Sequence, residues 1–279
     1  MSKIPACTAK LDRWRFAVLE SPQKWQGRPP SIPGFQIVKD SFVRQQTKVG
    51  TYGRVRSMEN PKTGTKLFIQ YGKKHGWLKP MLVTAVANAH TGIVKDLLAI
   101  STAFGHIKTR MVEIAFDCSA ESGIDRKFVL EHGLFGKSRP NHDPRFPHQL
   151  RYGTRHSAKL VRCYFKKETG TFRVEIELHS TWPGLPENGR TLHTLPLRPK
   201  DFRFVDLVWE TLDFYIRHKF PSGTLGIDAP RYGLHGCLSS LTAAGVNNPH
   251  LFLQPSQKDR LIRNAFAEWQ RSIRPGGKQ

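Results

Sequence analysis

Two segments in which apolar and charged residues alternate constrain the fold of this chain more than any other feature. They are Met111–Asp117 and Arg173–His179. Because successive side chains of a β-strand point to opposite faces of a sheet, this period of two predicts a strand in each segment. Each strand would carry two carboxylates on one face. The carboxylates are those of Glu113 and Asp117 on the first strand, and of Glu175 and Glu177 on the second.

Other patterns predict the elements around these strands. Further strands are expected at Val49–Ser57, Lys66–Tyr71, 158–166 and 172–179. Helices are expected at 92–104, 125–132, 201–218 and 256–273. Residues 1–34 are rich in Pro and are expected to form an irregular arm, and a Pro-rich connector is expected at 181–200. The predicted class is α+β, with a mainly antiparallel, ferredoxin-like sheet, helices on one face and a helical C-terminal extension.

Charge points to the class of partner. The chain has 279 residues, with 44 Lys and Arg against 22 Asp and Glu, and a formal net charge of +22. So large an excess predicts a polyanionic partner, nucleic acid before an anionic membrane. The apolar runs are too short for a membrane span, and the N-terminal residues predict no signal peptide.

The cysteines point to a reducing compartment. Cys7, Cys118, Cys163 and Cys237 lie far apart in the sequence and form no C-x-x-C pair. This spacing predicts neither a zinc site nor a disulfide framework. Reduced thiols are typical of cytoplasmic proteins.

The acids on the two alternating strands would form a cluster if the strands were neighbours. Such a cluster needs a counter-charge, supplied either by Lys or Arg or by a divalent metal with oxygen ligands. In the alternative interpretation, the acids pair with basic side chains on a solvated sheet face, which is ordinary for a half-exposed strand. The spacing leaves both open.

A row of basic and aromatic residues lies on a predicted strand between the two acidic ones. Arg162, Tyr164 and Lys166 would share one face of it. This arrangement suits a nucleic-acid backbone with a base stacked on the Tyr, although the Tyr could instead pack between basic stems. For the nucleic-acid role we expect Arg155, Arg162 and Lys166 to be exposed and not salt-bridged.

Three blocks in this region resemble those of the trans-acting Rep initiators of rolling-circle plasmids, whose fold is similar to that of the HUH endonucleases. The blocks are Gly153–Ser157, Arg162–Lys166 and Arg173–Glu175, and the resemblance covers roughly residues 65–180. It implies a Rep-like domain over 35–220, followed by a C-terminal helical region over 221–279.

The resemblance also implies an activity. Members of this family nick one DNA strand at an origin through a tyrosine, with a metal held by carboxylates. Mg²⁺ or Mn²⁺ would be bound by Asp117 and Glu175, with Glu113 and Glu177 as second choices. The partners implied are origin DNA, single-stranded or hairpin, and a host helicase. The residues implied to contact DNA are Arg155, Ser157, Arg162, Tyr164, Lys166 and Arg173.

The chain departs from the family at the nucleophile. Residues 180–200, after the third block, contain no Tyr. The nucleophile would then be Tyr215 or Tyr152, each of which could instead be a packing residue. Two functions follow: a metal-dependent origin nickase, or a DNA-binding protein of the same fold that does not nick. An RNA-binding or translation-associated protein would explain the charge but not the acidic strands.

Overall fold

A computed structural model describes most of the chain. The described residues are 6–20, 28–42, 53–74, 77–87, 93–135, 140–141, 148–154, 156–198, 202–208, 210–212 and 229–274.

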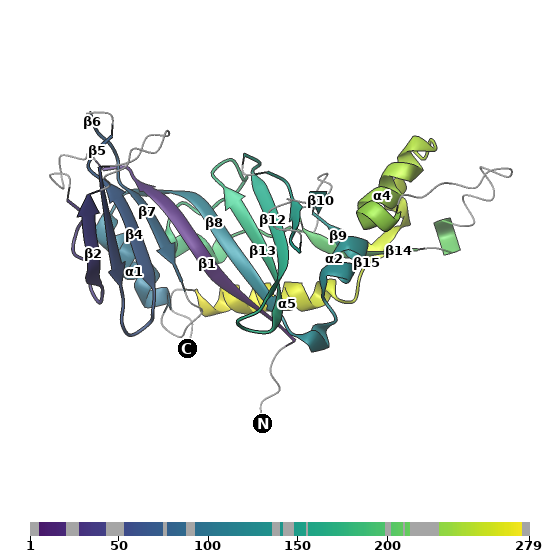
Figure 1. The fold of residues 1–279 in the computed structure, drawn as a ribbon, viewed down its shortest axis with the longest axis horizontal. Coiled ribbons are helices and arrows are strands. Elements are labelled where there is room, and N and C mark those ends of the chain that lie inside the picture. Colours follow the sequence, from purple (N-terminus) through teal and green to yellow (C-terminus); the bar gives the residue numbers. More distant parts are fainter. Residues whose placement is uncertain are drawn as a thin grey trace, which may run out of the picture. The chain divides into compact units, whose positions relative to one another are not determined.

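The structure is α+β, with most strands in one large antiparallel sheet (Figure 1). The ten strands of this sheet follow the order β10-β11-β12-β13-β8-β1-β7-β4-β3-β2. Their bounds in chain order are β1 Cys7–Val18, β2 Gln36–Phe42, β3 Arg54–Glu59, β4 Lys66–Tyr71, β7 Leu82–Val86, β8 Ile107–Cys118, β10 Pro140–Asn141, β11 Leu150–Tyr152, β12 Lys159–Lys166 and β13 Thr171–His179.

Two small sheets and the helices complete the fold. The small sheets are β15-β14-β9 (Leu253–Pro255, Arg203–Leu207 and Gly133–Leu134) and β5-β6 (Lys73–Lys74 and Trp77–Leu78). The α-helices are α1 Ile93–Phe104, α2 Arg126–His132, α4 Ala229–Ala243 and α5 Asp259–Ser272. Short 3₁₀ helices are η1 Ala120–Ser122, η2 Gly189–Thr194 and η3 Pro249–Phe252.

The chain divides into two compact units, each assembled from separate segments. Unit 1 comprises residues 1–8, 116–176 and 197–265, and unit 2 comprises 9–115, 177–196 and 266–279.

Unit 2 is built on the antiparallel strands β2, β3, β4, β7 and β1. Strand β7 pairs with β4 and with β1, where Trp14 lies opposite Ala85. Trp14 and Phe16 are fully buried, and Phe104 of α1 meets Phe16 edge-on at 5.5 Å between ring centroids. These contacts hold α1 against the strands.

A buried acid fixes the β3–β4 turn of unit 2 to α1. Asp96 of α1 is 3% exposed and accepts hydrogen bonds from the Asn60 amide at 2.7 Å and from the hydroxyls of Thr63 and Thr65 at 2.5 Å each. Buried carboxylates require such donors.

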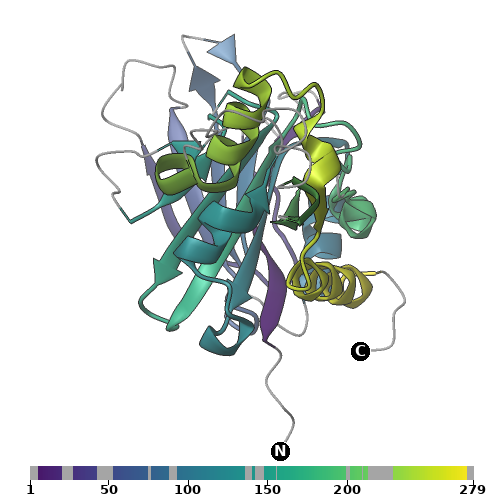
Figure 2. The same ribbon diagram turned by 90° about the vertical axis from the view of Figure 1, so that its right-hand side faces the viewer.

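Unit 1 has an aromatic core. Phe135 is its centre, with Phe202 stacked on it at 4.7 Å and Tyr152 edge-on at 4.7 Å between ring centroids. Phe204 and Phe128 extend the cluster. Helix α4 packs against α2 (Figures 1 and 2).

Most expected elements are confirmed, and so is the α+β class with a large antiparallel sheet. The strands at 66–71 and 111–118 and the helices at 92–104, 125–132 and 256–273 all lie within a few residues of their expected bounds. The strand expected at 49–57 begins at Arg54, and residues 49–52 lie outside the described part.

Two expectations are wrong. The arm expected over 1–34 contains β1, a strand of 12 residues whose apolar side chains are buried in the sheet. The helix expected at 201–218 begins instead as β14, because Arg203 and Phe204 pair with β9 and residues 205–207 pair with β15. Residues 213–218 lie outside the described part.

All four cysteines are free and buried. The Cys7 and Cys118 sulfurs lie 3.0 Å apart within unit 1.

Over the described residues, the helices are too short or too polar to cross a membrane.

Candidate functional site

An arginine lies between the two acids that the sequence predicted as metal ligands. Arg173 of β13 donates to both oxygens of Asp117, from Nε at 2.6 Å and from Nη2 at 2.8 Å. Its Nη1 lies 3.5 Å from Oε1 of Glu175. The Arg173 side chain is 4% exposed, so these are buried ion pairs. In this structure the cation that Asp117 and Glu175 share is therefore a guanidinium.

Two residues of β12 also contact Glu175. Nη2 of Arg162 lies 3.1 Å from Oε2, and the Tyr164 hydroxyl donates to Oε1 over 2.5 Å. Burial raises the pKa of the Tyr164 hydroxyl well above its usual value, and its hydrogen bond to Glu175 raises it further. We call Asp117, Arg162, Tyr164, Arg173 and Glu175 the strand network.

The strand network overturns one expectation. Arg162 was expected to be exposed and free of salt bridges, but its side chain is 25% exposed and pairs with Glu175. The reason is that Glu175 is buried and needs positive or hydrogen-donating neighbours. Arg162 and Tyr164, which share one face of β12, thus both contact the buried Glu175. Lys166, further along this face, is half-buried.

The other expected acids lie in unit 2. Glu113 of β8 is 1% exposed, and Nη1 of Arg13 lies 3.6 Å from its Oε2. Glu177, near the end of β13, is 3.1 Å from Nε2 of His179. Each has a basic neighbour on its own or an adjacent strand.

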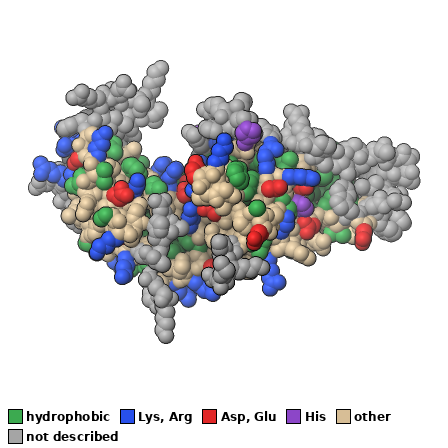
Figure 3. Space-filling view, turned by 60° about the horizontal axis from the view of Figure 1, so that its bottom comes forward, with side chains coloured by type: hydrophobic (Ala, Val, Ile, Leu, Met, Phe, Trp, Pro, Cys, Tyr) green, Lys and Arg blue, Asp and Glu red, His purple; other side chains and the backbone are tan. Residues whose placement is uncertain are grey.

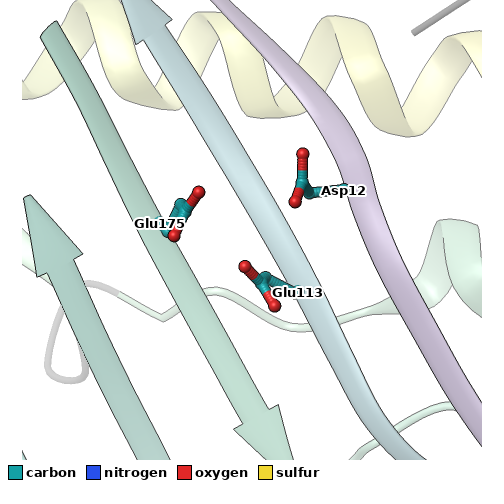
Figure 4. A group of neighbouring side chains, drawn as sticks. All are labelled: Asp12, Glu113 and Glu175. Atoms are coloured by element: carbon teal, nitrogen blue, oxygen red, sulfur yellow. The ribbon is translucent and has the colours of Figure 1, made fainter. Parts of the chain in front are cut away.

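A pair of carboxylates in unit 2 has the ligand chemistry of a divalent-metal site. In Figure 4, Asp12 of β1 and Glu113 of β8 each offer an oxygen within 4.8 Å of the other's. Oxygen ligands of this kind could hold a metal ion such as Mg²⁺ or Mn²⁺. Asp12 was missed because the first 34 residues were expected to be irregular. The alternation of Arg13, Trp14, Arg15 and Phe16, directly after Asp12, was the available signal for a strand.

The segment Gly153–Ser157 forms a tight turn. Gly153 has φ of +88°, and a Cβ there would lie 2.6 Å from the carbonyl oxygen of Lys159. The Ser157 hydroxyl accepts a hydrogen bond from the Thr154 amide at 3.0 Å. Gly153 and Ser157 thus shape the backbone here. Arg155 lies outside the described residues.

The two tyrosines expected as nucleophiles have different outcomes. Tyr152 is 1% exposed, and its hydroxyl donates to the Val129 carbonyl at 3.4 Å. Burial raises its pKa. Its hydroxyl is therefore inside the core of unit 1, where DNA does not reach it. Tyr215 lies outside the described residues.

No protein-family model and no curated protein matches the chain.

Proposed function

We propose that this chain is a DNA-binding protein of the replication-initiator type, with a Rep-like domain that binds an origin. The observation that carries the proposal is the formal net charge of +22. Lys and Arg side chains spread over the face drawn in Figure 3, with fewer Asp and Glu among them. A polyanion is the partner that such a surface attracts.

The burial of several acids strengthens this argument. Glu113, Glu175 and Asp96 are each at most 3% exposed. These three carboxylates are therefore withdrawn from the surface that a polyanion would meet. The acidic strands, which an RNA-binding or translation-associated protein would not require, favour an initiator.

Salt dependence tests the binding proposal. The affinity for duplex DNA should fall linearly on a log–log plot, with a slope of about −0.9 for each phosphate neutralised. The measurement is fluorescence anisotropy with a labelled duplex at increasing salt. DNA that flanks the coding sequence of the chain, compared with a scrambled duplex, tests for an origin. A slope near zero would remove nucleic acid as the partner.

Strand nicking is the second candidate, favoured by the carboxylate pair of Asp12 and Glu113 in unit 2 (Figure 4). A metal there would neutralise charge on a scissile phosphate, and a tyrosine would attack the phosphorus and displace the 3′ oxygen. Glu113 keeps its expected role in this proposal. Glu175 is a weaker choice because Tyr164 and Arg162 already contact its two oxygens. Asp117 is a weaker choice because Arg173 holds both of its oxygens.

A covalent adduct separates the two candidates. The protein would be incubated with supercoiled and single-stranded DNA in Mn²⁺ and then denatured. A labelled strand that stays attached to the protein supports nicking, and Tyr215→Phe should abolish it, whereas Tyr152→Phe should not. Salt-sensitive binding without an adduct supports the non-nicking protein.

A further inference from the structure

A groove of unit 1 combines aromatic side chains with a basic rim. It has a volume of about 1030 Å³ and lies beside α2 and the β12–β13 hairpin. Tyr164, Phe165 and Phe172 contribute aromatic surface to it. Arg126, Lys127 and Lys167 contribute positive charge.

Phe165 is the unusual member of this groove. It is 57% exposed, although apolar side chains of this size are favoured in the interior. Strand β11 pairs with β12 only as far as Cys163, so the register leaves the end of β12 beyond it without β11 as a neighbour. Phe165 therefore presents part of its ring to the groove, where it lies with Tyr164 and Phe172, and a contiguous apolar surface of this kind indicates a binding surface.

The neighbouring aromatics are held in place. Phe172 is 7% exposed, and the Tyr164 hydroxyl is held by Glu175. The wall of the groove beside Phe165 is therefore already ordered, so little conformational entropy is lost there when a flat ligand stacks on Phe165.

The rim favours an anionic ligand. Arg126, Lys127 and Lys167 are exposed, and the Lys127 Nζ lies 3.9 Å from a carboxylate oxygen of Glu131. The acid of the lining, Asp125, caps α2 by accepting a hydrogen bond from the Phe128 amide at 2.7 Å. The lining therefore has three positive side chains and one acid, and this excess of positive charge suits the phosphates of a nucleic-acid backbone.

We propose that this groove binds a short stretch of single-stranded DNA, with an unpaired base stacked on Phe165 and phosphates on Arg126, Lys127 and Lys167. Bases of a duplex are already stacked on each other, so an exposed ring selects unpaired nucleotides. The inference rests on the proposed function for the nature of the polyanion and adds which form of DNA binds and where.

The test compares Phe165→Ala with a matched aromatic control. Phe68→Ala removes another exposed ring, 41% accessible, in unit 2. Affinities for a labelled oligothymidylate and for a blunt duplex would be measured by anisotropy at fixed salt. Phe165→Ala should weaken oligothymidylate binding by roughly tenfold or more, the range expected for loss of one stacked base. Duplex affinity should not change, and Phe68→Ala should leave both affinities unchanged.

Further variants make the outcome decisive. Phe165→Tyr should retain binding because it keeps the ring, and Phe165→Trp should show fluorescence quenching when oligothymidylate is added. Unchanged oligothymidylate affinity in Phe165→Ala would overturn the groove proposal and leave salt-dependent duplex binding intact. Loss of all DNA binding by the wild-type protein would overturn the proposed function instead. A dimer that dissociates in Phe165→Ala, seen by sedimentation, would assign the groove to a second copy and also overturn the proposal.

Discussion

Arg173 binds Asp117 through a two-point fork, in which Nε and Nη2 each donate to a separate carboxylate oxygen at 2.6 and 2.8 Å. The planar guanidinium suits this geometry, and a lysine could not reproduce it. The same guanidinium also approaches Glu175, so Arg173 is a cation shared by two acids of unit 1, and Arg162 adds a second positive charge at Glu175.

Replacing Arg173 should therefore be costly. Arg173→Ala leaves Asp117 and Glu175 without their shared cation, and we expect the free energy of unfolding to fall by about 3 kcal/mol. Urea denaturation measures this. Lys66→Ala is the control, since the Lys66 Nζ lies 3.8 Å from Glu59 and both side chains are more than a third exposed. The control should lose about 1 kcal/mol or less. An equal loss in both variants would contradict the prediction.

Tyr164 should make the folded protein sensitive to alkali. Burial and the bond to Glu175 raise its pKa in the folded state, so the folded state holds this proton more tightly than the unfolded chain does. The corresponding stability is present below the unfolded pKa of about 10 and is lost as the pH rises through the folded pKa. Tyrosinate absorbance followed against pH, in parallel with circular dichroism, should show Tyr164 ionising together with unfolding. In Tyr164→Phe, the rise in tyrosinate absorbance that accompanies unfolding should be smaller by the contribution of one tyrosine. Normal titration of every tyrosine in the folded protein would refute this.

Gly153 should resist substitution for two reasons. Its φ of +88° disfavours any side chain, and an added Cβ would collide with the Lys159 carbonyl. Gly170 is the matched control, because it has φ of +64° but a Cβ added there would meet open space. We expect thermal denaturation to show a loss of about 3 kcal/mol for Gly153→Ala and about 1 kcal/mol for Gly170→Ala. Similar losses would mean that the turn moves to accept the methyl group.

Asp96 should be necessary for the stability of unit 2. Asp96→Ala leaves the donors of Asn60, Thr63 and Thr65 without their acceptor, at an expected loss of about 3 kcal/mol. Lys95→Ala changes the exposed neighbour on the same helix and should have little effect. Differential scanning calorimetry of both variants is the measurement. A stable Asp96→Ala protein would show that the turn finds other acceptors.

The sequence predicted which segments of the site are strands, but it did not predict which strands lie next to each other. The alternation at 111–117 and 173–179 requires extended backbone, and both segments are strands. Arg173 and Glu175 are two residues apart on one strand, so their shared face was also predictable. The involvement of Asp12 was not, because the pairing of distant strands depends on the whole sheet rather than on local pattern.

Local sequence patterns also led to two wrong expectations, one about the surroundings of β12 and one about residues 203–207. The alternation placed Arg162 and Tyr164 together, which is correct, but it could not tell that a buried Glu175 lies beside them. The apolar residues within 203–207 have a spacing that would also suit one face of a helix. This segment is a strand because it pairs with β9 and β15. Such outcomes depend on tertiary contacts.

The segmented composition of the two units has a consequence for synthesis on the ribosome. Unit 1 needs residues as early as Cys7 and as late as those of α5, and unit 2 takes the remainder of that same helix. Neither unit can be completed until residues of α5 have left the exit tunnel, so the apolar faces of β1 and β8 stay uncovered until then. Long sequence separation between partners slows folding and exposes aggregation-prone intermediates. Slower translation would offer this chain little benefit, whereas chaperones that bind extended apolar segments should raise its yield.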